Sequence, residues 1–175
     1  YDVRAHWALY VENYLEGLHV PFVHPGLNEA LDFAAYRTVL SPWGALQIGV
    51  AKPGEPSLDL PAGHPDGGAP VAALYFWLFP ATMVNVYPWG LSVNLVRPQG
   101  PDRTQIRFAS YLLDQARSAA GAGADLHAVE LEDEAVVEAV QRGVRSRLYR
   151  GGRFSPSRET AVHPFHRLLA RHLGG

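Results

Sequence analysis

The chain has 175 residues, of which 47% are hydrophobic and 18% are charged, and its formal net charge is −2. That length supports one sizeable core but not two full domains, so we expect a single domain over residues 1–175. The weak net charge and the lack of a long apolar run argue against nucleic-acid and membrane partners and predict a cytoplasmic protein. The sequence has no cysteine, which excludes disulfides and thiolate chemistry.

The pattern of apolar residues predicts an α+β domain. Pro21 should end a first amphipathic helix, because proline disfavours helical geometry in the residue before it. Short runs rich in β-branched and aromatic residues, separated by turn formers, then predict an antiparallel sheet with helices gathered on one face. Helices are expected over 5–18, about 132–149 and about 164–173, strands between 33 and 98 and over 105–114, and loops over 53–70 and 117–125.

Three residues with metal-binding or acid–base side chains follow one another closely near the N-terminus. In a helix of about 100° per residue, Glu16 and His19 would lie about 60° apart on one face. Because Pro21 turns the chain, His24 can approach the same point as His19 from the following loop. Two histidines at this spacing fit equally well a helix cap followed by an ordinary loop residue, so the segment alone leaves both interpretations open.

Asp133 is the acidic residue of the predicted helix 132–149 that faces the core. The helical projection places it within about 10° of the centre of an apolar stripe, whereas Glu132, Glu134 and Glu138 project towards solvent. A buried carboxylate costs several kcal/mol unless it is paired or binds a metal. The alternative is that Asp133 caps the helix or pairs with an arginine. The stripe consists of Val136, Val137, Val140, Val144 and Leu148.

Two imidazoles and one carboxylate form the facial triad of non-haem Fe(II) oxygenases, and the same set suits a catalytic zinc ion. The run NYLEGLHVPFVHPGL at 13–27 resembles the mononuclear-iron motif of Rieske ring-hydroxylating oxygenase α subunits. The run at 131–173 is similar to the C-terminal segment of that family, and FPATMVNVYPWGLSVNLVRPQGPDRT at 79–104 extends the resemblance to essentially the whole chain.

This resemblance implies a site and a fold. His19, His24 and Asp133 would be the ligands of a mononuclear Fe(2+), and Glu16 would be the catalytic residue that links this iron to a Rieske cluster on a neighbouring subunit. The implied fold is a helix-grip (Bet v 1-like or START-like) domain, in which a curved antiparallel sheet wraps around a long C-terminal helix and encloses the substrate cavity. The family also implies a homotrimer, O2 as co-substrate, and a reductase that supplies electrons.

The chain departs from the family pattern in two places. The family often has Asn-Trp before the first helix, where this chain has His6-Trp7, so any role of that asparagine is in doubt. A Rieske [2Fe-2S] cluster needs two cysteines and two histidines, and this chain has no cysteine. We expect the cluster on an upstream domain, which the start at Tyr1 favours, or on a separate partner protein.

Aromatic residues between 75 and 89 are candidates for a substrate pocket, where they could stack an aromatic ring or surround a quaternary ammonium group. Because neighbouring strand residues face opposite sides, about half should belong to the core. We expect a mono- or dioxygenase that hydroxylates or N-dealkylates an aromatic or alkylammonium substrate, and VYPWGLSVNLVRP favours the alkylammonium group. The alternatives are a metal-free helix-grip domain that binds an apolar ligand and a zinc hydrolase. The candidates are Tyr75, Phe76, Trp77, Phe79, Tyr87 and Trp89.

Overall fold

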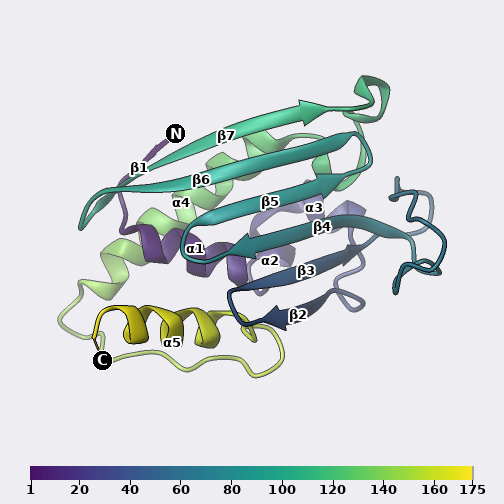
Figure 1. Cartoon of the computed structure of the whole chain (residues 1–175). Helices are drawn as coiled ribbons and strands as arrows, with labels where there is room; N and C mark the ends of the chain where they lie inside the picture. The colour runs from purple at the N-terminus through teal and green to yellow at the C-terminus, as the bar shows by residue number, and fades with distance from the viewer. Residues whose placement is uncertain (175) are drawn as a thin grey trace.

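A computed structural model describes residues 1–174, and it contains one seven-stranded antiparallel sheet with helices packed behind it (Figure 1). The strands follow the sheet order β1-β7-β6-β5-β4-β3-β2. Apart from the short β1, all of them fall where β-branched and aromatic runs predict strands. They are β1 (Asp2–Val3), β2 (Arg37–Ser41), β3 (Gly44–Val50), β4 (Val71–Leu78), β5 (Thr82–Tyr87), β6 (Gly90–Gly100) and β7 (Arg103–Leu112).

The helices are shorter or shifted relative to the predicted ranges. The first ends at Leu15 rather than residue 18, and the long helix starts about six residues before the predicted position. Its start is set by Asp125, whose carboxylate accepts the Ala128 N–H at 3.0 Å and caps the helix. The α-helices are α1 (Trp7–Leu15), α2 (Val20–Val23), α3 (Pro25–Ala30), α4 (Leu126–Val144) and α5 (Val162–His172). In the described part of the chain, none is long and apolar enough to cross a membrane.

The strand register places polar side chains next to one another on the sheet face that α1 and α4 cover. Tyr75 of β4 is paired with Gln47 of β3 on one side and with Asn85 of β5 on the other. These three residues are buried, and Figure 1 shows α1 and α4 crossing behind this part of the sheet. All three residues line one pocket, so this row belongs to a cavity wall rather than to a dry core.

The dry core lies beside this polar row, towards α5. Trp77 and Phe165 are both almost fully buried and pack edge to face, with ring centroids 5.4 Å apart. Val137 is the only member of the predicted apolar stripe on α4 that is fully buried, whereas Leu148 lies beyond the helix and is 80% exposed. The α+β prediction is therefore confirmed, while the extent of the stripe was wrong.

Tyr14 links α1 to the sheet through hydrogen bonds of its hydroxyl. Its hydroxyl donates to Asn85 Oδ1 at 2.7 Å and lies 3.2 Å from the Phe76 carbonyl oxygen. We expect Tyr14→Phe to lower the free energy of unfolding by about 1–3 kcal/mol, because it leaves the buried Asn85 oxygen without this donor. Urea denaturation would measure the loss. Tyr111→Phe, at a side chain 59% exposed, is the control, and equal stability of the two variants would contradict the assigned role.

Candidate functional site

His19 and His24 lie at the two ends of a single helical turn. His19 precedes α2 and His24 follows it, and His24 also starts α3. The backbone of His24 leaves the helical region, with φ −112° and ψ 83°, so the chain changes direction at that residue. As a result the two imidazoles lie side by side, edge to face, with ring centroids 5.0 Å apart and planes at 80°. The predicted turn between the histidines is confirmed, although Glu16 and His19 are not on one helix.

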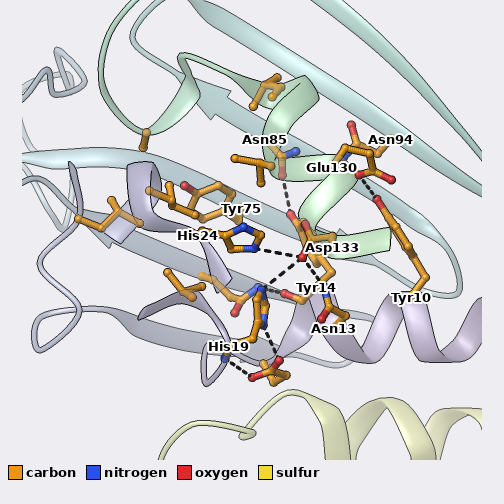
Figure 2. A pocket seen from close by; sticks show the side chains of 18 of the residues that line it. Tyr10, Asn13, Tyr14, His19, His24, Tyr75, Asn85, Asn94, Glu130 and Asp133 are labelled. Atoms are coloured by element: carbon orange, nitrogen blue, oxygen red, sulfur yellow. Dashed lines mark hydrogen bonds and ion pairs between the residues drawn. The ribbon is translucent and has the colours of Figure 1, made fainter. Parts of the chain in front are cut away.

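Asp133 lies on α4 and points between the two imidazoles (Figure 2). Its Oδ1 is 3.1 Å from His24 Nε2 and 3.4 Å from His19 Nε2. It also accepts a hydrogen bond of 2.6 Å from the side-chain amide of Asn13 on α1. Asp133 is therefore neither the cap of α4 nor the partner of an arginine, because the cap is Asp125 and the partners are the histidines and Asn13.

Each imidazole is oriented by a second carboxylate at its other nitrogen. His19 Nδ1 donates to Glu16 Oε1 at 2.5 Å, and His24 Nδ1 donates to Glu132 Oε2 at 2.7 Å. Both Nε2 atoms are thereby turned towards Asp133. A carboxylate on the far nitrogen is the usual way in which proteins fix a metal-binding histidine. Glu132, predicted to face solvent, thus contacts the site, and that prediction was wrong.

The electrostatics of the three residues are strongly coupled. Burial by itself lowers the pKa of His19, but hydrogen bonds to Asp133 and Glu16 outweigh it and raise the pKa to about 9. The pKa of His24 is also lowered by burial and raised on balance by its bonds to Asp133 and Glu132. Burial raises the pKa of Asp133, but the two imidazoles outweigh burial and lower it to about 2. Without a metal, a proton on His19 would balance the negative charge of this carboxylate.

The donor set fits a divalent metal ion. One ligand atom from each of His19, His24 and Asp133 lies within 4.8 Å of the other two. Ligands about 2.1 Å from a metal and at right angles to each other are about 3.0 Å apart, close to the two separations from Asp133 Oδ1. Two nitrogens and one oxygen that occupy a single face would leave the opposite positions open. The three side chains could therefore hold a catalytic rather than a closed structural metal.

A pocket opens from these three residues into the space between the helices and the sheet. The space between its atoms is about 770 Å³, a figure that includes open solvent at its mouth. Its walls combine apolar side chains with tyrosines and the polar row of the sheet. They include Leu27, Leu31, Tyr36, Tyr75, Asn85 and Tyr87.

Two members of the aromatic cluster predicted from the sequence line the pocket, but strand alternation separates only Phe76 from Tyr75, because Trp77 lies two residues further on and shares the face of Tyr75. Tyr75 and Tyr87 line the pocket, and Tyr36, which the sequence did not single out, lies against Tyr75 with ring centroids 6.4 Å apart. The remaining members pack in the hydrophobic clusters: Phe76, Trp77, Phe79 and Trp89. His6, which replaces the family's asparagine, accepts the Ala8 N–H at 3.3 Å and caps α1.

The comparison with known proteins agrees with this fold. Residues 1–175 match the model of the family "Ring hydroxylating alpha subunit (catalytic domain)", and the chain belongs to this family. Its relatives include a chloroplastic choline monooxygenase of Arabidopsis thaliana, 34% identical over 99% of this chain and 40% of the relative. The carnitine monooxygenase oxygenase subunit of Escherichia coli (strain K12) is also 34% identical, over 95% of this chain and 46% of the relative.

Solved structures show the same architecture. A quaternary ammonium Rieske monooxygenase matches with a TM-score of 0.80 and 28% identity over 98% of this chain and 48% of that chain. Dicamba monooxygenase, at 18% identity and a TM-score of 0.65, covers 97% of this chain and 56% of that chain and shares the fold. The predicted helix-grip fold is confirmed. The chain spans less than half the length of the choline and carnitine monooxygenases that it matches.

Proposed function

We propose that this chain is the single catalytic domain of a Rieske-type oxygenase, with mononuclear Fe(II) bound by His19, His24 and Asp133. The observation that carries the proposal is the convergence of three donor atoms from two distant segments at the end of a pocket. The family to which the chain belongs supports iron over zinc. When bound, the ferrous ion would supply the activation of dioxygen next to the substrate.

The residues around the ligands would set their geometry and protonation. Glu16 and Glu132 hold the Nδ1 protons of His19 and His24, so that each Nε2 is available to the metal. Asn13 fixes the Asp133 oxygen. These contacts hold the ligand side chains in one arrangement, which reduces the reorganisation needed on binding.

Glu16 would also connect the site to an electron donor. Its side chain lines both the internal pocket and a surface groove that contains Phe22, a residue 85% exposed. It therefore lies between the ligand His19 and the outside of the domain. We assign it to electron entry from a Rieske [2Fe-2S] cluster on another domain or subunit, with a reductase upstream. The inter-subunit electron transfer named for the quaternary ammonium Rieske monooxygenase supports an electron donor on another subunit, and the assembly we propose is a homotrimer.

The pocket walls and the relatives favour an alkylammonium substrate and a monooxygenase reaction over a ring dioxygenation. Tyr36, Tyr75 and Tyr87 lie next to one another, and aromatic faces attract quaternary ammonium groups. Burial raises the pKa of each of these three phenols, which keeps them neutral. Hydroxylation or N-dealkylation of such an amine is the proposed outcome.

A spectroscopic experiment tests this function without the electron-transfer partner. The protein is reconstituted with Fe(II) under argon and treated with nitric oxide, a stable substitute for dioxygen. We expect about one iron per chain and the EPR signal of a high-spin ferrous nitrosyl complex, because three ligands leave positions open. Addition of choline should change the shape of this signal, since the substrate would lie next to the metal.

The alternatives give different results in the same experiment. No bound iron together with tight binding of an apolar ligand would identify a metal-free binding domain. Preference for zinc together with hydrolytic turnover would identify a hydrolase. Iron that binds without reacting with nitric oxide would mean a closed coordination sphere and would contradict the oxygenase.

A further inference from the structure

Glu130 is a buried acid in the pocket, and none of the interactions described above for the metal ligands involves it. It lies on α4, one turn before Asp133, and is only 3% exposed. Its Oε2 accepts the Tyr10 hydroxyl at 2.7 Å, which Figure 2 shows at the right of the site. Its Oε1 is buried and has no hydrogen-bond partner among residues 1–174. An ionised carboxylate in this position costs several kcal/mol unless a positive charge comes near it.

The pocket offers no such charge from its own walls. Among the described residues that line it there is no lysine or arginine. The other two carboxylates of the lining are engaged, Asp133 by the histidines and Glu16 by His19 and the Leu18 N–H. Glu130 therefore carries the one carboxylate of the pocket that lacks a cationic or imidazole partner.

We infer that Glu130 is the counter-ion of the substrate, and that the substrate is a small alkylammonium cation without a carboxylate, such as an ammonium alcohol. This inference rests on the proposed function and goes further, because the two relatives named above act on choline, a cation, and on carnitine, a zwitterion. A zwitterion would bring its carboxylate into a pocket without lysine or arginine and close to a buried acid. A cationic alcohol brings only the positive charge that Glu130 needs as a partner.

Two other features of Glu130 and the pocket agree with this assignment. Burial has the largest effect on the pKa of Glu130 and raises it, and the nearby charge of Asp133 raises it further. The hydrogen bond from Tyr10 lowers it, and the result is a pKa of about 8. This is expected for a buried acid that has no cationic partner. The Tyr75 hydroxyl is also buried without a partner and lines the pocket, so it can donate to a substrate oxygen. A phenol donates equally to an alcohol or a carboxylate, so the discrimination falls to Glu130.

Calorimetric titrations test the inference on the Fe(II)-loaded protein under argon. The probes are choline, glycine betaine, L-carnitine, and the neutral carbon isostere of choline, 3,3-dimethylbutan-1-ol. We expect choline to bind at least about tenfold more tightly than each of the other three. Glu130→Gln keeps the shape of the side chain but removes its charge. It should weaken the binding of choline by about tenfold or more and leave the affinity for the neutral alcohol nearly unchanged.

The matched control is Glu134→Gln, one turn further along α4. Glu134 also has a buried oxygen without a partner, but it does not line the pocket, so choline affinity should be retained. Equal binding of betaine and choline, equal loss in both variants, unchanged choline affinity in Glu130→Gln, or no binding of choline would overturn the inference. The iron content of the same samples separates the two levels: iron without these preferences refutes the role of Glu130 alone, whereas absent iron refutes the proposed function.

Discussion

His24→Ala and His19→Ala are each expected to leave the protein with almost no iron after anaerobic reconstitution and desalting. Loss of an outer partner such as Glu132 should lower the affinity for the metal by roughly 10–100-fold, and loss of a ligand itself should lower it further. His24 is the more informative position, because only 1% of it is exposed and its two nitrogens contact Glu132 and Asp133. Iron per chain, measured by mass spectrometry, gives the result directly.

Two further variants separate metal binding from folding. Asp133→Asn keeps the size of the side chain and removes the charge, so it should also lose iron without opening a cavity. His166→Ala is the matched control, because His166 likewise contacts a carboxylate, Glu12 at 2.7 Å, but lies on the surface. Full iron in both His24→Ala and His19→Ala would rule out the proposed site.

The affinity for Fe(II) is expected to rise at least about tenfold per pH unit between pH 6 and 8. In the metal-free protein the pKa of His19 is about 9, so its imidazole holds a proton that the metal must displace, and the raised pKa of His24 acts in the same direction. Asp133, with its pKa lowered to about 2, is already ionised throughout this range. Competition with a chromophoric chelator, corrected for the chelator's own protonation, measures the slope.

The same pKa shifts determine whether the stability of the metal-free protein rises or falls with pH. A pKa raised in the folded state contributes stability that is complete below the unfolded value of about 6.5 and is lost as pH rises through about 9. The metal-free fold should therefore weaken over the range in which iron binds best. Glu12→Gln, which alters the partner of His166 alone, should leave the iron slope unchanged. An affinity independent of pH would mean that His19 is neutral before the metal binds.

The sequence was sufficient for the fold where local patterns and tertiary packing agree. The strands β5 and β6 and the helix α5 show this agreement best, because the two strands bury alternate residues and the helix buries Val162, Phe165 and Leu168 on one face. The range of α4 was wrong at both ends, since Asp125 caps the helix before the apolar stripe begins and the chain leaves the helix before Leu148. Asp125 stands directly before Leu126, and an Asp at the N-cap position is a sequence signal that could have corrected the predicted start.

Local helix geometry was sufficient to predict some of the acidic residues around the site but not others. Asp133 could be distinguished from its acidic neighbours because it lies one turn before the buried Val137 on α4. Glu132 could not, because its partner His24 comes from a segment 108 residues away and covers a flank of α4 that would otherwise face solvent. Glu130 was missed because the predicted helix began after it. On the observed helix it lies one turn before Asp133, so the earlier start would have placed it on the same buried face.

The long separation in sequence between the proposed ligands has a further consequence for the chain as a polymer. His24 and Asp133 are 109 residues apart, so a metal that joins them closes a loop of more than half the sequence. A covalent cross-link around a loop of this size would restrict the unfolded chain by about 4–5 kcal/mol in a simple entropy model. In this chain without cysteine, the metal would act as a reversible cross-link. It would form only after folding has brought His24 and Asp133 together.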